Sequence, residues 1–506
     1  MNALDASGPL KQNDFLRDTV PEIPQHDVEA ITRPRGEAAR SYAVRARIYP
    51  KLAHGNFRRA KWMVMLLTLG IYYFLPWVRW ERGEGLPNQF FLIDFAHQRL
   101  LLGSVEIWAQ EFYYITGILI ISALGLFLVT ALAGRVWCGY ACPQTVWTDL
   151  MIMVERFWQG DRNAHMRLDQ QPWTFEKIWK KTATHLSWIL IGFFTGGAVI
   201  FYFRDAPTLL QELLDGSASP VALVFLGIFT FSTYLLGGIA REQVCIYMCP
   251  WPRIQGAMLD RDSLLISYRD LRGEPRGAHK KGQTWEGRGD CIDCRACVVV
   301  CPMGIDIRNG SQLECIQCAL CIDACDEIMD KVGRPRGLIA YSTERNQMSK
   351  TAGPRDGLTF LRPRIMIYSF LILLVGSVML WAMFSRSDMG VSVLPDRNPL
   401  FVRLSDGGIR NGYTIKVSNK KEQMRRFKIE LSGLEDFKTS VVGLEKEEFI
   451  FEVPPAEVRA LKVFVSLSSE AVKKLKSDST HLRVTVQEVD GGAVSTRDTT
   501  FRSPHP

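Results

Sequence analysis

The chain has 506 residues, of which 47% are hydrophobic, and a formal net charge of +8, so it is long enough for several domains. Strongly apolar blocks alternate with strongly polar segments, and the basic residues concentrate beside the apolar blocks. This pattern is typical of a membrane protein. No block of Lys and Arg with interleaved aromatic residues is present, and we therefore expect no nucleic-acid partner.

The first 60 residues are polar and then basic. Residues 1–40 contain no apolar segment of the kind found in a secretory signal, and we expect a flexible tail. Basic side chains then crowd the start of the first apolar block: Arg45, Arg47, Lys51, Arg58, Arg59 and Lys61. We assign 1–60 to a flexible, basic N-terminal segment on the cytoplasmic side.

Five apolar blocks are long enough to cross a bilayer. They are 62–78, 112–133, 183–203, 220–240 and 365–384. The segment 79–111 between the first two is amphipathic and too rich in charge to span, so we expect a loop there. The sequence thus predicts a five-span α-helical bundle, with four spans in 61–250 and the fifth in 362–386.

The distribution of Lys and Arg predicts the orientation of these spans. The loops 135–182 and 241–361 contain seven and 17 basic residues, whereas 79–111 and 204–219 contain three and one. The positive-inside rule places the basic loops and the N-terminus in the cytoplasm. The C-terminal segment then lies outside, which is the periplasm for a bacterial inner-membrane protein.

Eight of the twelve cysteines form two C-x2-C-x2-C-x3-C runs. The runs are Cys291, Cys294, Cys297, Cys301 and Cys315, Cys318, Cys321, Cys325. Such runs hold 4Fe–4S clusters, and the fourth cysteine of each run binds the other cluster in two-cluster ferredoxins. We expect one cluster at Cys291, Cys294, Cys297 and Cys325, and another at Cys315, Cys318, Cys321 and Cys301. Zinc sites usually use paired knuckles set further apart, so 251–361 is predicted to be a cytoplasmic, ferredoxin-type domain.

The other four cysteines form a repeated motif. Cys138-Gly-Tyr-Ala-Cys142-Pro follows the second predicted span, and Cys245-Ile-Tyr-Met-Cys249-Pro follows the fourth, 107 residues later. Both motifs read C-x-Y-x-C-P, and an arginine precedes each. A repeat of a span and a motif allows the two motifs to face each other across a pseudo-twofold axis.

Three interpretations of this motif compete. On a continuous helix the two cysteines of a motif would share one face, but the proline after the second cysteine disfavours helical geometry in the residue before it. The thiols could be buried structural groups, a redox dithiol pair, or a metal or metal-reduction site close to the clusters. We favour the metal site, because thiolates suit Cu(I), zinc and iron–sulfur centres. Met248 could add a thioether.

Histidines and nucleotide motifs contribute little. His185 is the only histidine within a clear predicted span, and we expect His97 and His165 to be solvated or capping residues in loops. No Gly-rich phosphate loop follows a recognisable strand, so electrons are expected to come from a partner or from quinol.

Residues 387–506 contain no cysteine and form a separate domain. Segments with alternating apolar residues, at 413–417, 427–431, 449–453, 461–465 and 482–486, are separated by turn residues. About seven short strands in such a length predict an all-β, immunoglobulin-like sandwich.

The order of these parts resembles a known family. Five segments are similar to those of the cytochrome c oxidase accessory family, called CcoG, FixG or RdxA. They are GRVWCGYACPQTVW (134–147), VCIYMCPWPR (244–253), the ferredoxin segment GDCIDCRACVVVCPMGIDIR, PRGLIAY (335–341) and RNPLFVRLSDGGIRNGYT (397–414). The resemblance extends from about residue 45 to the end. It implies an inner-membrane iron–sulfur protein with five spans and a C-terminal immunoglobulin-like domain.

The resemblance also implies a role in assembling the cbb(3)-type oxidase, as a reductase that converts Cu(II) to Cu(I). We then expect electrons to pass from two 4Fe–4S clusters to copper at Cys138, Cys142, Cys245 and Cys249. The expected partners are copper chaperones or oxidase assembly factors, cbb(3)-type oxidase subunits and an unknown electron donor, and a homodimer is one state we consider. The alternatives are an electron conduit from quinol to a periplasmic reductase and a non-redox assembly scaffold.

Overall fold

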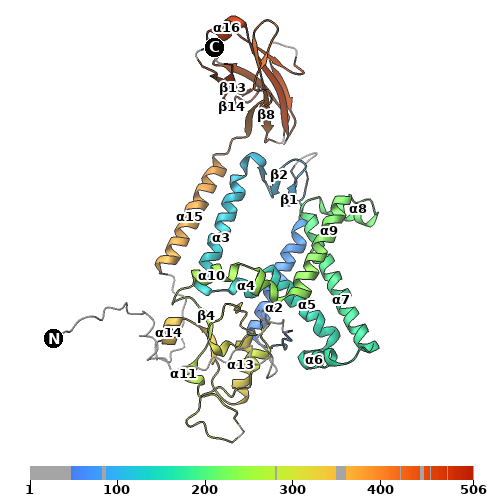
Figure 1. Ribbon diagram of the computed structural model, residues 1–506, viewed down its shortest axis with the longest axis vertical. Helices are drawn as coiled ribbons and strands as arrows, with labels where there is room; N and C mark the ends of the chain where they lie inside the picture. Colours follow the sequence, from blue (N-terminus) through green and yellow to red (C-terminus); the bar gives the residue numbers. More distant parts are fainter. Residues whose placement is uncertain are drawn as a thin grey trace, which may run out of the picture. The chain divides into compact units, whose positions relative to one another are not determined.

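The computed structural model in Figure 1 describes residues 47–82, 87–279, 282–348, 361–421, 423–444, 449–455, 457–475 and 477–504. The expected tail at 1–40 and Arg45 lie outside the described residues. The chain divides into two compact units. The first unit contains the chain up to Leu75, Ile118–Phe201 and Leu209–Leu373, and the second contains Pro76–Gly117, Tyr202–Thr208 and Leu374 onward.

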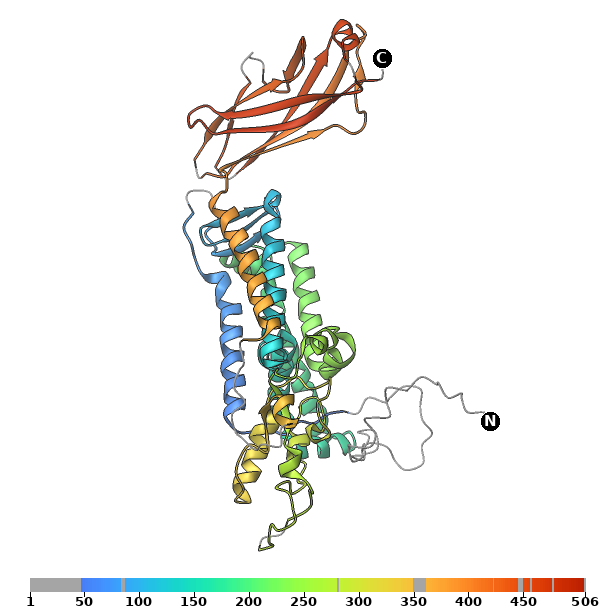
Figure 2. The same ribbon diagram turned by 90° about the vertical axis from the view of Figure 1, so that its left-hand side faces the viewer.

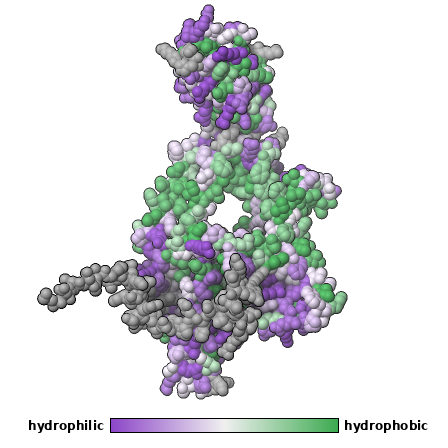
Figure 3. All heavy atoms as spheres, in the orientation of Figure 1, coloured by the Kyte–Doolittle hydropathy of each residue, from purple (hydrophilic) through white to green (hydrophobic). Residues whose placement is uncertain are grey.

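Four helical segments of the described chain are long and apolar enough to cross a membrane. They are α3 (Tyr113–Ala133), α7 (Phe175–Thr195) with the 3-10 segment η3 (Gly197–Tyr202), α9 (Pro220–Thr233) with the π-helical η4 (Tyr234–Ala240), and α15 (Pro363–Phe384). Only 6% to 39% of each apolar stretch is buried inside the protein, and Figure 3 shows hydrophobic surface over these helices. Four of the five predicted spans coincide with these segments.

The first predicted span, 62–78, is not among these four. The chain there forms α2 (Asn56–Phe74) and the 3-10 turn η1 (Leu75–Trp77). The first turns of α2 carry Arg58 and Lys61, which are buried and pair with Asp149. The rest of the helix exposes large apolar side chains, including Leu66 and Phe74. The membrane span at 62–78 therefore stays a prediction.

Small residues bring the helices of the first unit close together. A Cβ atom on Gly192 of α7 would lie 2.8 Å from the backbone oxygen of Thr230 in α9. A Cβ on Gly196, the residue that caps α7, would overlap the backbone oxygen of Phe229. Such close approach of backbones is typical of packed membrane helices. Helix α5 (Pro143–Gln159) packs against both α7 and η4. Short helices connect these elements: α4 (Val136–Tyr140), α6 (Arg162–Gln170), α8 (Ala206–Leu214), the π-helical η5 (Val244–Met248) and α10 (Trp251–Met258).

The ferredoxin-type segment is closed by a two-stranded antiparallel sheet. Strand β4 (Leu265–Tyr268) pairs with β5 (Ile339–Ser342), with Leu265 opposite Ser342. This pairing brings together the two ends of a segment that contains the eight clustered cysteines. Within it lie α11 (Asp270–Gly273), α12 (Ala296–Val299), the 3-10 turn η6 (Ile307–Asn309) and α13 (Leu320–Lys331), and α14 (Glu344–Met348) follows.

A three-stranded sheet occupies much of the segment that we expected to be a loop. Antiparallel strands β1 (Phe91–Asp94), β2 (Arg99–Leu102) and β3 (Val105–Trp108) are followed by the 3-10 turn η2 (Ala109–Glu111). The turn between β1 and β2 has no Gly or Pro, and Gln98 adopts the left-handed conformation there (φ 54°). Because this hairpin lacks the usual turn residues, the sequence pattern did not reveal it.

The C-terminal part of the second unit is the predicted all-β sandwich (Figure 2). Its strands are β6 (Met389–Pro395), β7 (Val402–Arg403), β8 (Ile409–Asn419), β9 (Arg425–Ser432), β10 (Phe437–Val441), β11 (Ile450–Val453), β12 (Val458–Leu467), β13 (Ser479–Glu488) and β14 (Val494–Arg502), with the short helix α16 (Ser469–Lys473). One antiparallel sheet has the order β10-β12-β8-β6, with β7 paired to β8, and the other has β11-β9-β13-β14. All five strands predicted from sequence are present.

The inward-facing residues of both sheets form one core. Phe427, Ile415 and Val484 have 0–2% of their surface exposed, and the Tyr413 hydroxyl donates to the Thr500 oxygen at 2.9 Å. Every second residue of β8, β12 and β13 is buried over most of each strand, as expected for a sandwich. Strand β14 escaped sequence analysis because it is an edge strand in which only Phe501 is buried.

Truncating Phe427 to alanine should destabilise this domain by about 3–5 kcal/mol, because the fully buried ring would leave a cavity in the core. Hydrogen–deuterium exchange of β9 and β13 in the full chain measures the loss. Val494→Ala, on a side chain that is 56% exposed, is the control and should change protection by less than about 0.5 kcal/mol. Equal protection in both variants would contradict the packing described above.

Candidate metal centre

The eight cysteines of the ferredoxin-type segment line two small cavities in the first unit. One cavity is lined by Cys291, Cys294, Cys297 and Cys325. The other is lined by Cys301, Cys315, Cys318 and Cys321, and Cys297 borders it as well. None of these cysteines forms a disulfide. The remaining lining of both cavities is mostly apolar, which leaves the thiols as the main ligand-forming groups.

The two cysteine runs wrap around their cavities with the same backbone conformation. Asp293 and Arg295, on either side of Cys294, have φ of 52° and 55°. Gln317 and Ala319, on either side of Cys318, have φ of 55° and 60°. Left-handed conformations at non-glycine residues cost energy and persist only where the surroundings impose them. Their repetition shows that each run is shaped to curl around a central group.

Helix α13 connects the two cavities. Cys321 and Cys325 lie one turn apart on this helix, and each lines a different cavity. On the other side, Cys297 lies in α12 and Cys301 lies just beyond it. Each run therefore contributes its first three cysteines to one cavity and its fourth to the other.

Burial controls the protonation of these thiols. It raises the pKa of Cys297, Cys301 and Cys325 to about 12 and that of Cys315 to about 11. The cavities thus favour neutral thiols until iron replaces the protons. Thiols around a compact apolar cavity fit a 4Fe–4S cluster, which thiolates bind and which needs little water around it.

The two C-x-Y-x-C-P motifs adopt different local structures. In the first, α4 carries Cys138 and ends at Tyr140, and Cys142 is extended (φ −61°, ψ 127°) before Pro143 begins α5. In the second, η5 carries Cys245, and Cys249 is extended (φ −80°, ψ 121°) before Pro250. The helix therefore does not continue through either motif. The proline forces this outcome, because it disfavours helical geometry in the preceding residue.

The thiols of Cys138, Cys142 and Cys249 nevertheless lie within electrostatic reach of Cys245. The pKa of Cys245 is raised to about 12, mainly by burial and then by the nearby thiols of Cys142, Cys138 and Cys249. Burial and then Cys142 raise the pKa of Cys138 to about 11. In the described part of the chain, however, no group of three or more His, Cys, Asp and Glu side chains is arranged to hold a metal ion. Four thiols thus lie within electrostatic reach of one another without forming a closed ion site.

The first motif is packed directly on the second ferredoxin cysteine run. A Cβ atom on Gly139 would lie 2.6 Å from the Ile316 oxygen and 3.0 Å from the Cys318 backbone. The Tyr140 hydroxyl donates to the Cys318 oxygen at 3.2 Å. Cys138 and Cys245 both pack against the apolar core that contains Cys318 and Ile316. The repeated motifs therefore face the second cavity.

Arg135 and Gln255 hold this arrangement, and sequence analysis missed the role of both. The Arg135 backbone N–H donates to Gln317 at 2.8 Å, and its guanidinium donates to the backbone oxygens of Leu313 and Pro252. The Gln255 side chain is fully buried, accepts from the Cys138 thiol at 3.3 Å and donates to Thr130 at 3.2 Å. An arginine at the end of an apolar span, just before a cysteine motif, was the available signal for Arg135.

Comparisons with known proteins agree with this site. Three family models match this chain. One, described as a 4Fe-4S dicluster domain, matches residues 240–344, and another, described as a 4Fe-4S binding domain, matches 115–159. The third, described as the IG-like fold at the C-terminal of FixG, matches 379–504. The nitrogen fixation protein FixG of Rhizobium meliloti is 50% identical over 84% of this chain and 87% of its own length. This chain belongs to the FixG family. Protein RdxB of Cereibacter sphaeroides is 48% identical over 93% of this chain and 99% of its own length. Protein RdxA of the same organism is 51% identical over 79% of this chain and 86% of its own length.

Membership of the FixG family confirms the resemblance and the coarse architecture. The chain is a multi-domain, membrane-associated iron–sulfur protein with ferredoxin-type 4Fe–4S domains and a C-terminal immunoglobulin-like domain. The match to 115–159 includes Cys138 and Cys142, the first C-x-Y-x-C-P pair.

One expectation about an individual residue of this FixG-family chain is wrong. His165 was expected to be a solvated or capping loop residue, but it lies in α6 with 6% of its surface exposed, between Glu155 and Asp169. His165 is therefore a packed residue of the interior of the first unit. Met248 is 63% exposed, which does not support a buried thioether ligand. His97 is exposed and hydrogen-bonds Asp94 at 2.7 Å, as a capping residue would.

Replacing Gly139 by alanine should disrupt the packing of the first motif, because the added Cβ meets backbone atoms that have no room to move. We expect lower iron content and lower cluster absorbance near 400 nm in the purified protein. Gly125→Ala in α3 is the matched control, since a Cβ there meets nothing within 4 Å. Wild-type iron content in Gly139→Ala would contradict the close approach.

Proposed function

We propose that this FixG-family chain is a membrane-bound oxidoreductase that reduces Cu(II) to Cu(I) and supplies Cu(I) for assembly of a cbb(3)-type oxidase. The observation that carries the proposal is the packing of the two C-x-Y-x-C-P motifs on the second ferredoxin cysteine run. A redox centre and a group of free thiols thereby lie side by side. Such an arrangement suits transfer of electrons to a thiol-bound ion.

The two 4Fe–4S clusters would be held by the cysteines that line the two cavities. The first set is Cys291, Cys294, Cys297 and Cys325, and the second is Cys315, Cys318, Cys321 and Cys301. Bound clusters supply single electrons over a wide range of potentials. Cys138 and Cys245 are placed toward the second set, so copper would be reduced next to that set.

Copper is the substrate of this reaction, and the thiols of Cys138, Cys142, Cys245 and Cys249 are its proposed ligands. One electron converts Cu(II) to Cu(I), and soft thiolates favour Cu(I). Because burial keeps the thiols of Cys138 and Cys245 protonated, binding of copper there would release protons. The Cu(I) formed would then leave for a chaperone or an oxidase subunit.

The topology that follows from the positive-inside rule fits this role. We place the N-terminus and the ferredoxin-type domain in the cytoplasm and the immunoglobulin-like domain in the periplasm, at the inner membrane. The seven basic residues of 135–182 and the 17 of 241–361 support this orientation. Copper chaperones, assembly factors and oxidase subunits would then be the partners.

The double variant Cys138→Ser/Cys142→Ser should abolish Cu(II) reduction and leave the cluster absorbance intact. Serine removes the soft ligands, while the eight cluster cysteines are unchanged. The measurement is anaerobic titration of the reduced, full-length protein with Cu(II), followed optically for clusters and copper. Reoxidation of the clusters by Cu(II) at the wild-type rate in this variant would refute the copper-binding role. Reoxidation by quinone and not by copper would favour the electron-conduit alternative.

The crossed ligand sets predict a pattern of cluster loss. Cys294→Ala/Cys325→Ala removes two ligands of one cluster and should lower the iron content by about half. Cys294→Ala/Cys301→Ala removes one ligand from each cluster and should lower it further. Iron analysis and Mössbauer spectroscopy of the purified variants measure the difference. The reverse order of iron contents would assign each run to a single cluster.

A further inference from the structure

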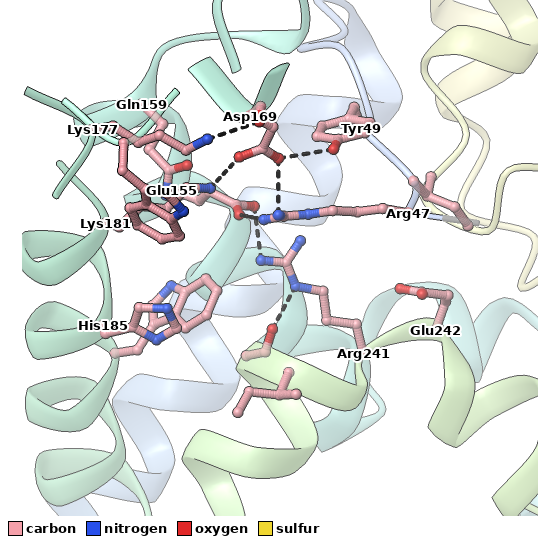
Figure 4. Close-up of a pocket in the computed structure, with 15 residues that line it drawn as sticks. Arg47, Tyr49, Glu155, Gln159, Asp169, Lys177, Lys181, His185, Arg241 and Glu242 are labelled. Carbon is pink, nitrogen blue, oxygen red and sulfur yellow. Dashed lines mark hydrogen bonds and ion pairs between the residues drawn. The ribbon is translucent and has the colours of Figure 1, made fainter. Parts of the chain in front are cut away.

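A large cavity lies in the first unit, away from the cysteines. Its volume is about 620 Å³, within the usual range for small-molecule sites of about 300–1,000 Å³. Helix α5, helix α7 and the end of η4 form its walls, and the segment around Arg47 crosses one side (Figure 4). The proposed copper site uses none of these walls.

The cavity lies at the ends of two candidate membrane spans. Lys177, Lys181, His185 and Trp188 line it from one face of α7, at intervals of three to four residues. Ile239 lines it from the last turn of η4. Both segments belong to stretches that are apolar enough to cross a membrane. A ligand could therefore place a polar head in the cavity and an apolar tail along the spans.

The charged groups of the cavity are already paired within the protein. Buried Glu155 accepts from Arg47 at 3.0 Å and from Arg241 at 2.8 Å. Asp169 binds Lys181 at 2.5 Å and Arg47 at 2.8 Å. Lys177 donates to the backbone oxygens of Asp169 and Gln171 at 2.8 and 2.6 Å. Because every lining cation of this group has a partner, the cavity favours a neutral ligand over a phosphate or another anion.

One polar group in the wall lacks a partner. The side-chain oxygen of Gln159 is buried and accepts no hydrogen bond from the residues that the structure describes, although its nitrogen donates to Thr184 at 2.8 Å. Gln159 as a whole is 97% buried, since 3% of its surface is exposed, and it lines the cavity. A buried acceptor is costly to leave unpaired. The missing donor is best supplied by a hydroxyl group of a ligand.

The cavity also reaches toward the redox centre. Arg241 and Glu242 line it, and the same two residues line a smaller cavity with Cys245, Pro302 and Ile316. Pro302 follows Cys301, and Ile316 lies between Cys315 and Cys318 of the second cysteine run. A ligand in the large cavity would thus be separated from that run by the wall that Arg241 and Glu242 form.

We propose that this cavity binds the head group of a membrane quinol, which is the electron donor of the protein. A quinol is neutral, carries hydroxyl donors for Gln159 and has a flat ring that suits the apolar side chains of Trp188 and Ile239. Its oxidation breaks two O–H bonds and yields a quinone, two protons and two electrons. The two oxidised 4Fe–4S clusters accept one electron each, and the two protons are released to water. The proposal concerns electron input and does not depend on copper as the acceptor.

Binding of a short-chain ubiquinone to the full-length, cluster-loaded protein in detergent tests the proposal directly. Calorimetric titration should show one saturable site. Gln159→Met removes the acceptor and should raise the Kd roughly tenfold. Gln170→Met, on an exposed residue of α6 outside the cavity, is the matched control and should bind as the wild type does. Ile239→Trp fills the cavity without removing a hydrogen bond and should abolish binding, which keeps the test valid if Gln159→Met does not fold.

Photo-crosslinking with an azido-quinone should label peptides of α5 and α7. Under anaerobic conditions, a short-chain quinol should reduce the clusters of the wild type but not those of Ile239→Trp. Unchanged quinone affinity in Ile239→Trp, labelling elsewhere, or a co-purified phospholipid in the cavity that quinone does not displace would overturn the proposal. The Cys138→Ser/Cys142→Ser variant should bind quinone normally. Failure of copper reduction and failure of quinone binding can therefore be told apart.

Discussion

The close packing of Gly139 on the backbone of Ile316 and Cys318 is the contact on which the candidate site depends. A residue without a Cβ fits best there, because a Cβ would lie 2.6 Å from the backbone oxygen of Ile316 and 3.0 Å from the backbone of Cys318. Tyr140 and Arg135 add hydrogen bonds to the same run from either side of the glycine. The chain that leaves a candidate span thus meets a cysteine run that follows it by almost 180 residues. The cluster segment is therefore an integral part of the membrane-associated unit, and its position relative to the thiol motifs is built into the fold.

Much of this architecture could be predicted from the sequence, because its signals are local. The C-x2-C-x2-C-x3-C spacing, four apolar spans and five alternating strands are each encoded in short stretches, and the structure contains all of them. The break of the helix before Cys142 and Cys249 also follows from the proline after each cysteine. What the sequence left open was whether the helix or the proline would dominate, and backbone sterics decided it.

The features that escaped prediction depend on contacts between distant residues. His165 is buried among Tyr49, Glu155 and Asp169. Only Asp169, four residues along α6, is near it in the sequence, and no motif reveals the other two. Gln255 looks like any glutamine in sequence, yet it is fully buried between Thr130 and Cys138. The sheet β1–β3 lacks turn residues in its first hairpin, and a buried arginine, Arg82, supports it by donating to the backbone oxygens of Gly103, Gln89 and Phe90.

Buried charge has the same role in both units, where it joins segments that are far apart in the chain. In the second unit Glu111, after β3, accepts from Arg386 at 2.8 Å and from Lys420 at 2.6 Å, and so ties the small sheet to the sandwich. In the first unit Glu155 joins Arg47 to Arg241. Removing one partner of such a group leaves an uncompensated buried charge, which is far more costly than the pair is stabilising. The cavity beside Glu155 therefore has a rigid polar wall whose charges are satisfied before any ligand arrives. A neutral ligand adds no charge that this wall would have to compensate, and the one group left for it to satisfy is the oxygen of Gln159.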